Sequence, residues 1–313
     1  MKLKDPLFYA KILLFGEYSI IEDSMGLSIP YNFYQGRLQK GSLEVEANKN
    51  SNEHLRKYYH HLLSLQESGE MQCELDLKRF NKDIESGLFF DSNIPQGFGV
   101  GSSGALVAAI YNNYVVKGIT SNQQLKKKEI VKLKATFAQM ESYFHGKSSG
   151  IDPLIIYLNI PLLIKSKSDI GVVGIPDGLE GKGAIFLLDT GQPGETQPLV
   201  NLFMEKMKQD GFRKMIKDQF VAYNDDCIQS FLTSDFKGLF KNLKNLSQFL
   251  LEHFKPMIPS VFHKLWKQGL DTNAYYLKLC GSGGGGFILG FTENLEEAKT
   301  ALNGYELEVI HRF

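Results

Sequence analysis

Hydrophobic and polar residues follow patterns typical of both strands and helices along the first half of the chain. A run rich in apolar and aromatic residues at 8–21 predicts a strand that is broken at Gly16 and Glu17. Alternation with a period of two predicts further strands, and apolar residues three or four positions apart predict helices. The predicted strands are 28–37, 43–47, parts of 75–90 and 154–175, and the predicted helices are 52–68 and 122–145.

The second half of the chain is predicted to form a layer of helices that covers a sheet. The predicted helices are 197–209, 212–232, 235–253, one that ends near Gly269, and 293–303. The predicted strands are 184–189, two that flank a glycine loop within 277–291, and 305–310. Glycine and charged residues cluster at 178–183 and indicate a boundary, so we expect one domain at 1–180 and a second at 181–313.

Composition narrows the class of protein. The 313 residues, 43% of them hydrophobic, are enough for one large domain or two ordinary ones. Lys plus Arg and Asp plus Glu are balanced at 35 each, so we expect neither nucleic acid nor an anionic membrane as a partner. Cys73, Cys227 and Cys280 lie far apart, which argues against a disulfide framework or a zinc site. Charged residues interrupt the apolar start, unlike in a signal peptide, and we expect a soluble cytoplasmic protein.

The stretch PQGFGVGSSGALVAA at 95–109 predicts a glycine loop that leads into a helix, because an apolar run of small residues follows the glycines without a turn signal. Glycine lets the backbone approach a ligand closely. The unpaired N–H groups at the start of a helix attract anions, most often phosphate. Ser102 and Ser103 fall at this start, where a hydroxyl can cap the helix, bind phosphate or ligate a metal. A glycine-rich turn without a ligand is the alternative.

Two better-known phosphate motifs do not fit this chain. Residues 99–104 read G-x-G-x-x-G, but Asn93-Ile94-Pro95 precedes them in place of the apolar strand that a dinucleotide site requires. The one Gly-Lys-Ser, at 146–148, has Glu141 where a Walker A loop needs its first glycine.

Glu141 falls at the margin of the apolar stripe of the predicted helix 122–145. An unpaired carboxylate buried there would be costly, so it needs a partner. Spacing alone leaves two interpretations, a glutamate in a salt bridge at the edge of the core and a ligand of a magnesium ion.

The glycine loop resembles the phosphate loop of the GHMP small-molecule kinases, in which Pro and a spacer precede Gly-Leu-Gly-Ser-Ser-Ala-Ala. This chain departs from that pattern at Val100, where Leu is usual, and at Gly104, where Ala is usual. The resemblance implies that ATP phosphates bind along the loop, at Pro95, Gly97, Gly99, Val100, Gly101, Ser102, Ser103 and Gly104.

A second run, ESYFHGKSSGID at 141–152, resembles the mevalonate kinase branch, whose pattern is Glu-x-x-x-His-Gly-x-Pro-Ser-Gly-x-Asp. Ser148 replaces the usual Pro. The resemblance implies that Asp152 is the catalytic aspartate and that Glu141 is a magnesium ligand. A magnesium ion takes few protein ligands, and Ser103 is the hydroxyl that we expect beside Glu141. His145 alone is more typical of a packed or capping histidine and receives no role.

The N-terminal run and the second glycine loop extend the resemblance over nearly the whole chain. Lys11 matches the N-terminal lysine of the family, and Glu17 matches its Gly-Glu carboxylate. Tyr18 stands where mevalonate kinases usually have His and phosphomevalonate kinases more often have Tyr. From the residues alone, Lys11 would be a surface lysine at a strand end. The resemblance makes it a second catalytic residue.

Further residues are expected near the substrate. They are Glu17, Tyr18, Thr196, Gly283 and Gly284. Thr196 precedes an apolar run and could equally cap a helix. The loop that holds the two glycines could equally be a flexible hairpin.

The resemblance implies an α+β fold of two domains, an N-terminal one built on a mixed sheet and a C-terminal ferredoxin-like one, with ATP and substrate in a cleft between them. The implied reaction is transfer of the γ-phosphoryl group of ATP, with Mg2+, to the hydroxyl of mevalonate, which yields 5-phosphomevalonate for isoprenoid synthesis. Phosphomevalonate kinase, another GHMP kinase and a non-catalytic metabolite sensor are the alternatives. A homodimer is compatible with all of them.

Overall fold

The computed structural model describes residues 3, 6–120, 125–166, 169–176 and 181–313. The chain forms two compact units that alternate along the sequence. Unit 1 comprises 1–11, 30–95 and 101–160, and unit 2 comprises 12–29, 96–100 and 161–313. The division into domains at residue 180 stays a prediction, and 177–180 lie outside the described residues.

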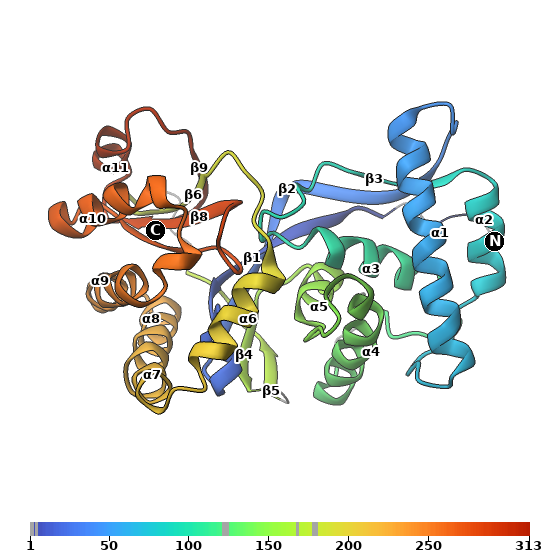
Figure 1. Cartoon of the computed structure of the whole chain (residues 1–313), viewed down its shortest axis with the longest axis horizontal. Helices are drawn as coiled ribbons and strands as arrows, with labels where there is room; N and C mark the ends of the chain where they lie inside the picture. Colours follow the sequence, from blue (N-terminus) through green and yellow to red (C-terminus); the bar gives the residue numbers. More distant parts are fainter. Residues whose placement is uncertain (1–2, 4–5, 121–124, 167–168, 177–180) are drawn as a thin grey trace. The chain divides into compact units, whose positions relative to one another are not determined.

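Within its described residues, unit 1 combines the strand pair β2 (Gly26–Lys40) and β3 (Leu88–Ser92) with five helices. The strand β2 enters from unit 2 and pairs antiparallel with β3, with Gly36 opposite Ser92 and Lys40 opposite Leu88. The helices are α1 (Glu46–Glu67), α2 (Leu77–Glu85), α3 (Ser102–Tyr114), α4 (Lys127–His145) and α5 (Ile151–Leu158). In Figure 1, α3, α4 and α5 lie together in the green part of the chain, and α3 contacts both of the others.

The helix α3 is the centre of unit 1 because its residues are small enough to be surrounded. Ala105, Val107, Ala108 and Ala109 are completely buried. Such side chains let neighbouring helices approach closely, and Gly104 allows the nearest approach, to the backbone of Pro153 at the start of α5. The N-termini of α3 and α5 are therefore brought together.

Unit 2 contains a second, four-stranded sheet in the order β7–β8–β6–β9. Its strands are β6 (Ala184–Asp189), β7 (Tyr276–Leu279), β8 (Phe287–Thr292) and β9 (Leu307–Arg312), and the pairs β6–β8, β6–β9 and β7–β8 are antiparallel. The start of β2 pairs with β4 (Leu162–Ser166), which pairs with β5 (Asp169–Val172), both antiparallel. The strand β1 (Phe8–Phe15) lies beside β2 and passes from unit 1 into unit 2.

Helices make up most of the rest of unit 2. They are η1 (Ser19–Glu22), α6 (Thr196–Lys206), α7 (Asp210–Met215), a π-helical turn at Ile216–Phe220, α8 (Val221–Leu232), α9 (Phe236–His253), α10 (His263–Thr272) and α11 (Leu295–Ala301), with short 3-10 turns at Lys255–Met257 and Ser260–Phe262. Of these, α8 and α9 pack along each other, and α9 contacts β7 (Figure 1).

Most predicted elements are confirmed, and four strand predictions are wrong. After Glu17, the run 8–21 continues as the 3-10 helix η1 rather than as a strand. The predicted strand 43–47 is a turn that leads into α1, where the alternating Leu43 and Val45 remain exposed. Most of 75–90 is the helix α2, capped by Asp76, whose side chain accepts from the N–H of Arg79. The first part of the predicted strands 154–175, residues 154–158, belongs to the helix α5, because this apolar run is buried on nearly all sides and shows no period.

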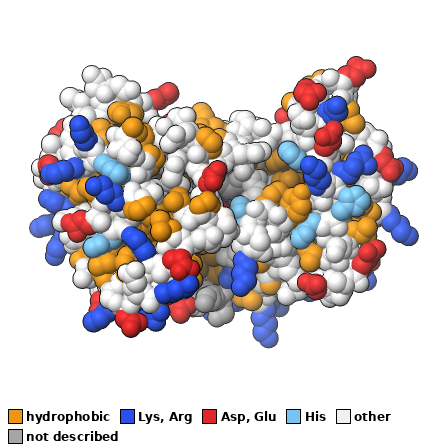
Figure 2. All heavy atoms as spheres, viewed as in Figure 1, with side chains coloured by type: hydrophobic (Ala, Val, Ile, Leu, Met, Phe, Trp, Pro, Cys, Tyr) orange, Lys and Arg blue, Asp and Glu red, His pale blue; other side chains and the backbone are white. Residues whose placement is uncertain are grey.

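The surface carries both signs of charge. On the face in Figure 2, Lys and Arg side chains are interspersed with Asp and Glu. None of the helices in the described part of the chain combines the length and the apolar character of a membrane span.

Candidate active site

The glycine loop leads directly into α3, as the sequence predicts, and its end lies in unit 1. Gly101 is the residue before the helix and has a φ of 87°, a left-handed conformation that favours glycine. A Cβ on Gly101 would lie 3.1 Å from Cγ of Lys11, so the absence of a side chain lets this lysine pass close to the loop. Ser102 and Ser103 occupy the first turn, where the positive end of the helix dipole lies.

Lys11 and Asp152 form an ion pair in unit 1. Nζ of Lys11 lies 2.9 Å from Oδ2 of Asp152. The lysine side chain is 4% exposed, whereas that of Asp152 is 38% exposed. Asp152 lies in the first turn of α5, after Gly150 with its φ of 70°. The carboxylate is therefore open to solvent on one side and neutralised by a buried cation on the other.

Ser103 and Glu141 meet close to this pair, also within unit 1. The hydroxyl of Ser103 donates to Oε1 of Glu141 over 3.0 Å. Glu141 lies near the end of α4 and is only 3% exposed. Burial, and then the negative charge of Asp152, raise the pKa of the Glu141 carboxyl from 4.5 to about 7, although hydrogen bonds from two serines oppose them. An added cation would relieve this repulsion.

Two residues to which the sequence assigned no role contact the same cluster. Nε2 of His145 lies 3.1 Å from Oγ of Ser103, and burial lowers the pKa of this imidazole although Asp152 opposes the shift. The hydroxyl of Ser148 donates to Oε2 of Glu141 over 2.5 Å. The departure from Pro at Ser148 was visible in the sequence, but its contact depends on the chain reversing after α4.

The donors in this cluster fit a magnesium ion. A hydroxyl and a carboxylate are hard oxygen donors, and magnesium takes its other ligands from water and phosphate. Within the described ranges, no three His, Cys, Asp or Glu side chains are grouped so that they could hold a metal by themselves. A site at Ser103 and Glu141 would thus depend on the phosphates for the rest of its ligands.

Unit 2 contains a second polar cluster, built from Glu17 and the end of β7. Nζ of Lys278 lies 2.6 Å from Oε2 of Glu17, and both side chains are almost completely buried. The hydroxyl of Tyr18 donates to the carbonyl of Ser282 over 2.7 Å. Burial, and then the charge of Glu17, raise the pKa of Tyr18, so that its phenol stays protonated.

Thr196 lies beside this cluster. It is the first residue of α6 and is exposed, and Glu195 rather than Thr196 occupies the cap position. The alternative that Thr196 caps the helix is therefore wrong. Its hydroxyl instead accepts from the hydroxyl of Ser282 over 3.2 Å.

The two glycine loops meet within unit 2. A Cβ on Gly99 would lie 2.7 Å from the carbonyl oxygen of Cys280, and a Cβ on Gly286 would lie 2.5 Å from Cα of Phe98. Gly283 has a φ of 80°, and its Cβ would lie 2.4 Å from the carbonyl oxygen of Met257. Close backbone packing thus explains part of the glycine content of the second loop, and this loop is no free hairpin.

The remaining loop residues differ in exposure. In the first loop, Val100 is completely buried in unit 2, whereas Pro95 is half-buried in unit 1. In the second loop, the N–H of Gly284 donates to the carbonyl of Met257.

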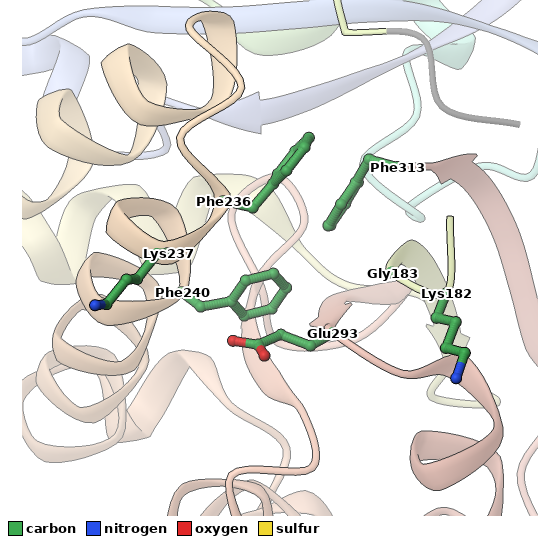
Figure 3. Close-up of a pocket in the computed structure, with 7 residues that line it drawn as sticks. All are labelled: Lys182, Gly183, Phe236, Lys237, Phe240, Glu293 and Phe313. Atoms are coloured by element: carbon green, nitrogen blue, oxygen red, sulfur yellow. The ribbon is translucent and has the colours of Figure 1, made fainter. Parts of the chain in front are cut away.

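A pocket of about 350 Å³ lies elsewhere in unit 2 (Figure 3). Its lining consists of Lys182, Gly183, Phe236, Lys237, Phe240, Glu293 and Phe313. The rings of Phe236 and Phe313 stack at 4.6 Å, and the amines of both lysines point away from the rings. None of the site residues predicted from the sequence lines this pocket.

Two family models match the chain and decide its family. The model of the GHMP kinase N-terminal domain matches residues 63–159, and that of the GHMP kinase C-terminal domain matches 227–308. Together they cover more than half of the sequence. The chain belongs to the GHMP kinase family. The α+β fold expected from the sequence is confirmed, and the protein is a small-molecule kinase that uses ATP.

Solved structures agree with this fold over almost the full length. Mevalonate kinase from L. major, in complex with R-mevalonate, has 14% sequence identity and a TM-score of 0.62, with 99% of this chain and 97% of that one covered. Phosphomevalonate kinase from Streptococcus pneumoniae, in complex with phosphomevalonate and AMPPNP, has 14% identity and a TM-score of 0.60, with 98% and 100% covered. Galactokinase from Lactococcus lactis, complexed with galactose, has 11% identity and a TM-score of 0.60, with 99% and 94% covered. No curated protein sequence matches this GHMP kinase.

Proposed function

We propose that this GHMP kinase transfers the γ-phosphoryl group of ATP to the hydroxyl of mevalonate, giving 5-phosphomevalonate. One observation carries the proposal. The run 141–152, which resembles mevalonate kinases, supplies both the buried carboxylate of Glu141 and the exposed carboxylate of Asp152. Each has the partner that phosphoryl transfer needs, a hydroxyl on Ser103 for the first and the ammonium of Lys11 for the second.

Asp152 would accept the proton of the substrate hydroxyl at its exposed carboxylate. The buried ammonium of Lys11 lies 2.9 Å from that carboxylate and would stabilise the negative charge that develops on the transferring group. Lys11 belongs to β1, and its buried side chain passes close to Gly101 of the glycine loop, so it can act without first losing side-chain freedom.

The loop at 95–104 would hold the phosphates, with N–H groups of Gly101, Ser102 and Ser103 at the positive end of α3. Ser103 and Glu141 would hold the magnesium ion, which neutralises phosphate charge when bound. Ser103 and Glu141 already place one hydroxyl and one carboxylate oxygen 3.0 Å apart before the metal binds.

Glu17, Tyr18, Thr196, Gly283 and Gly284 would shape the substrate side. The exposed hydroxyl of Thr196 can reach a polar substrate, whereas Tyr18 would act through the loop, since its phenol is already bonded to Ser282. Tyr18 also favours a second candidate, phosphomevalonate kinase, because that branch more often carries Tyr at this position.

A coupled assay of ADP release with mevalonate, phosphomevalonate, homoserine and galactose tests the proposal, with Asp152→Asn as the paired variant. We expect turnover of mevalonate, and a loss of about 100-fold or more in the variant. Turnover of phosphomevalonate alone would select the second candidate. Turnover that survives in the variant would remove Asp152 from its role.

A further inference from the structure

We propose that Ser148 and His145 are positioning residues that hold the two magnesium ligands, Glu141 and Ser103, in place before the nucleotide binds. The inference rests on the proposed function, because it takes the metal site from it. Neither residue needs to touch the metal or the substrate. Ser148 contacts Glu141, and His145 contacts Ser103.

The direction of the Ser148 hydrogen bond follows from its second partner. Oγ of Ser148 accepts from the N–H of Gly150 over 3.0 Å, so its proton is free to point to Oε2 of Glu141. Gly150 is the residue before α5, the helix that carries Asp152. Ser148 therefore ties the carboxylate of Glu141 to the turn that positions Asp152. A proline at 148, as in the resembling run, could not make this bond.

The direction at Ser103 follows in the same way. The hydroxyl proton of Ser103 points to Oε1 of Glu141, so Nε2 of His145 must carry a proton and donate it to Oγ. One lone pair of Oγ then remains for a metal ion. The two oxygens of Glu141 each accept one serine hydroxyl, and their remaining lone pairs are likewise available.

This arrangement fixes the rotamers of both ligands. A glutamate side chain loses considerable freedom when it is fixed, and prior fixing removes that loss from the binding step. Residues that orient metal ligands change metal affinity by about 10–100-fold when they are removed. The contribution of Ser148 and His145 should therefore appear in the coupling between magnesium and nucleotide rather than in nucleotide binding alone.

The test measures by calorimetry the affinity of the full chain for the non-hydrolysable analogue AMPPNP, with and without Mg2+. The ratio of the two affinities isolates the metal contribution. We expect Ser148→Ala and His145→Ala each to lower this ratio by about tenfold and to leave the Mg2+-free affinity unchanged. Ser148→Thr keeps the hydroxyl and should restore the ratio.

Two further variants separate the possible failures. Ser142→Ala, a matched control on α4 whose hydroxyl donates to a helix carbonyl, should keep the wild-type ratio. If Glu141→Gln lowers the ratio but the Ser148 and His145 variants do not, the positioning role is overturned and the metal site stands. If Glu141→Gln leaves the ratio unchanged, the metal site itself is wrong, and the positioning role falls with it. An equal loss of Mg2+-free affinity in Ser148→Ala and Ser148→Thr would mean a structural role only.

Discussion

Replacing Glu141 by glutamine should stabilise the metal-free protein at alkaline pH. The folded protein raises the pKa of this carboxyl from 4.5 to about 7, so between these values the folded state binds a proton that the unfolded state has lost. The contribution of Glu141 to stability is therefore fully present below pH 4.5 and is lost as the pH rises through 7. Glutamine resembles the protonated acid at every pH, so the variant does not lose this stability as the pH rises.

The magnitude follows from the difference in pKa. About 2.5 pKa units correspond to roughly 3 kcal/mol, at about 1.4 kcal/mol for each unit. Most of this, roughly 2–3 kcal/mol, is lost between pH 5 and 8. Glutamine has an NH2 group in place of one carboxyl oxygen, and this nitrogen cannot accept a hydrogen bond, so glutamine cannot accept from both Ser103 and Ser148, which costs about 1 kcal/mol at every pH. The variant should thus be about as stable as the wild type or slightly less stable near pH 5, and about 2 kcal/mol more stable at pH 8.

Urea unfolding of both proteins at pH 5, 6, 7 and 8, with EDTA present, measures this difference. Glu53→Gln, which changes an exposed glutamate on α1, is the control and should show no such trend. A difference between Glu141→Gln and wild type that stays constant within about 0.5 kcal/mol from pH 5 to 8 would refute the reasoning.

Three other substitutions test the packing around the two clusters, each by denaturant unfolding. Gly101→Ala should lower the free energy of unfolding by about 1–3 kcal/mol more than Gly69→Ala does. Both glycines have a positive φ, but only at Gly101 would a Cβ meet Ile156 and Lys11. Equal losses would mean that the close approach of Lys11 to the loop is unimportant. Tyr18→Phe should lower the free energy of unfolding by about 1 kcal/mol, because the hydrogen bond to Ser282 is lost. An unchanged stability with a raised KM would instead mean that the phenol binds the substrate. Lys278→Met should cost about 3–5 kcal/mol by leaving the carboxylate of Glu17 buried without this lysine, and Glu17→Gln combined with it should recover part of the loss; no recovery would argue against the ion pair as the cause.

The sequence predicts the elements of this fold best where local chemistry is distinctive. The glycine loop followed by small apolar residues correctly predicts α3, and the strand at 184–189 is confirmed as β6. Uniformly apolar runs are harder, because burial on all sides erases the period that separates helix from strand. The run 151–158 illustrates this, although Gly150 before it and Pro153 in its first turn are typical of a helix start.

The sequence predicts only those site residues that belong to contiguous sequence motifs. Three separate motifs contain the site residues Lys11, Asp152, Ser103 and Glu141. The family resemblance already predicted that these residues share one site, and the structure shows the contacts between them. The contacts of His145 and Ser148 depend on how the chain turns between α4 and α5, which no local pattern encodes. The partner of Glu17 is likewise a lysine 261 positions away in the sequence.

The measurement that tests the central claim most directly is 31P NMR of the product formed from mevalonate and ATP with Mg2+. The account predicts a new phosphate monoester signal that grows in step with ADP and is absent with Asp152→Asn. Formation of no monoester from mevalonate, while phosphomevalonate under the same conditions gives a diphosphate product, would contradict it.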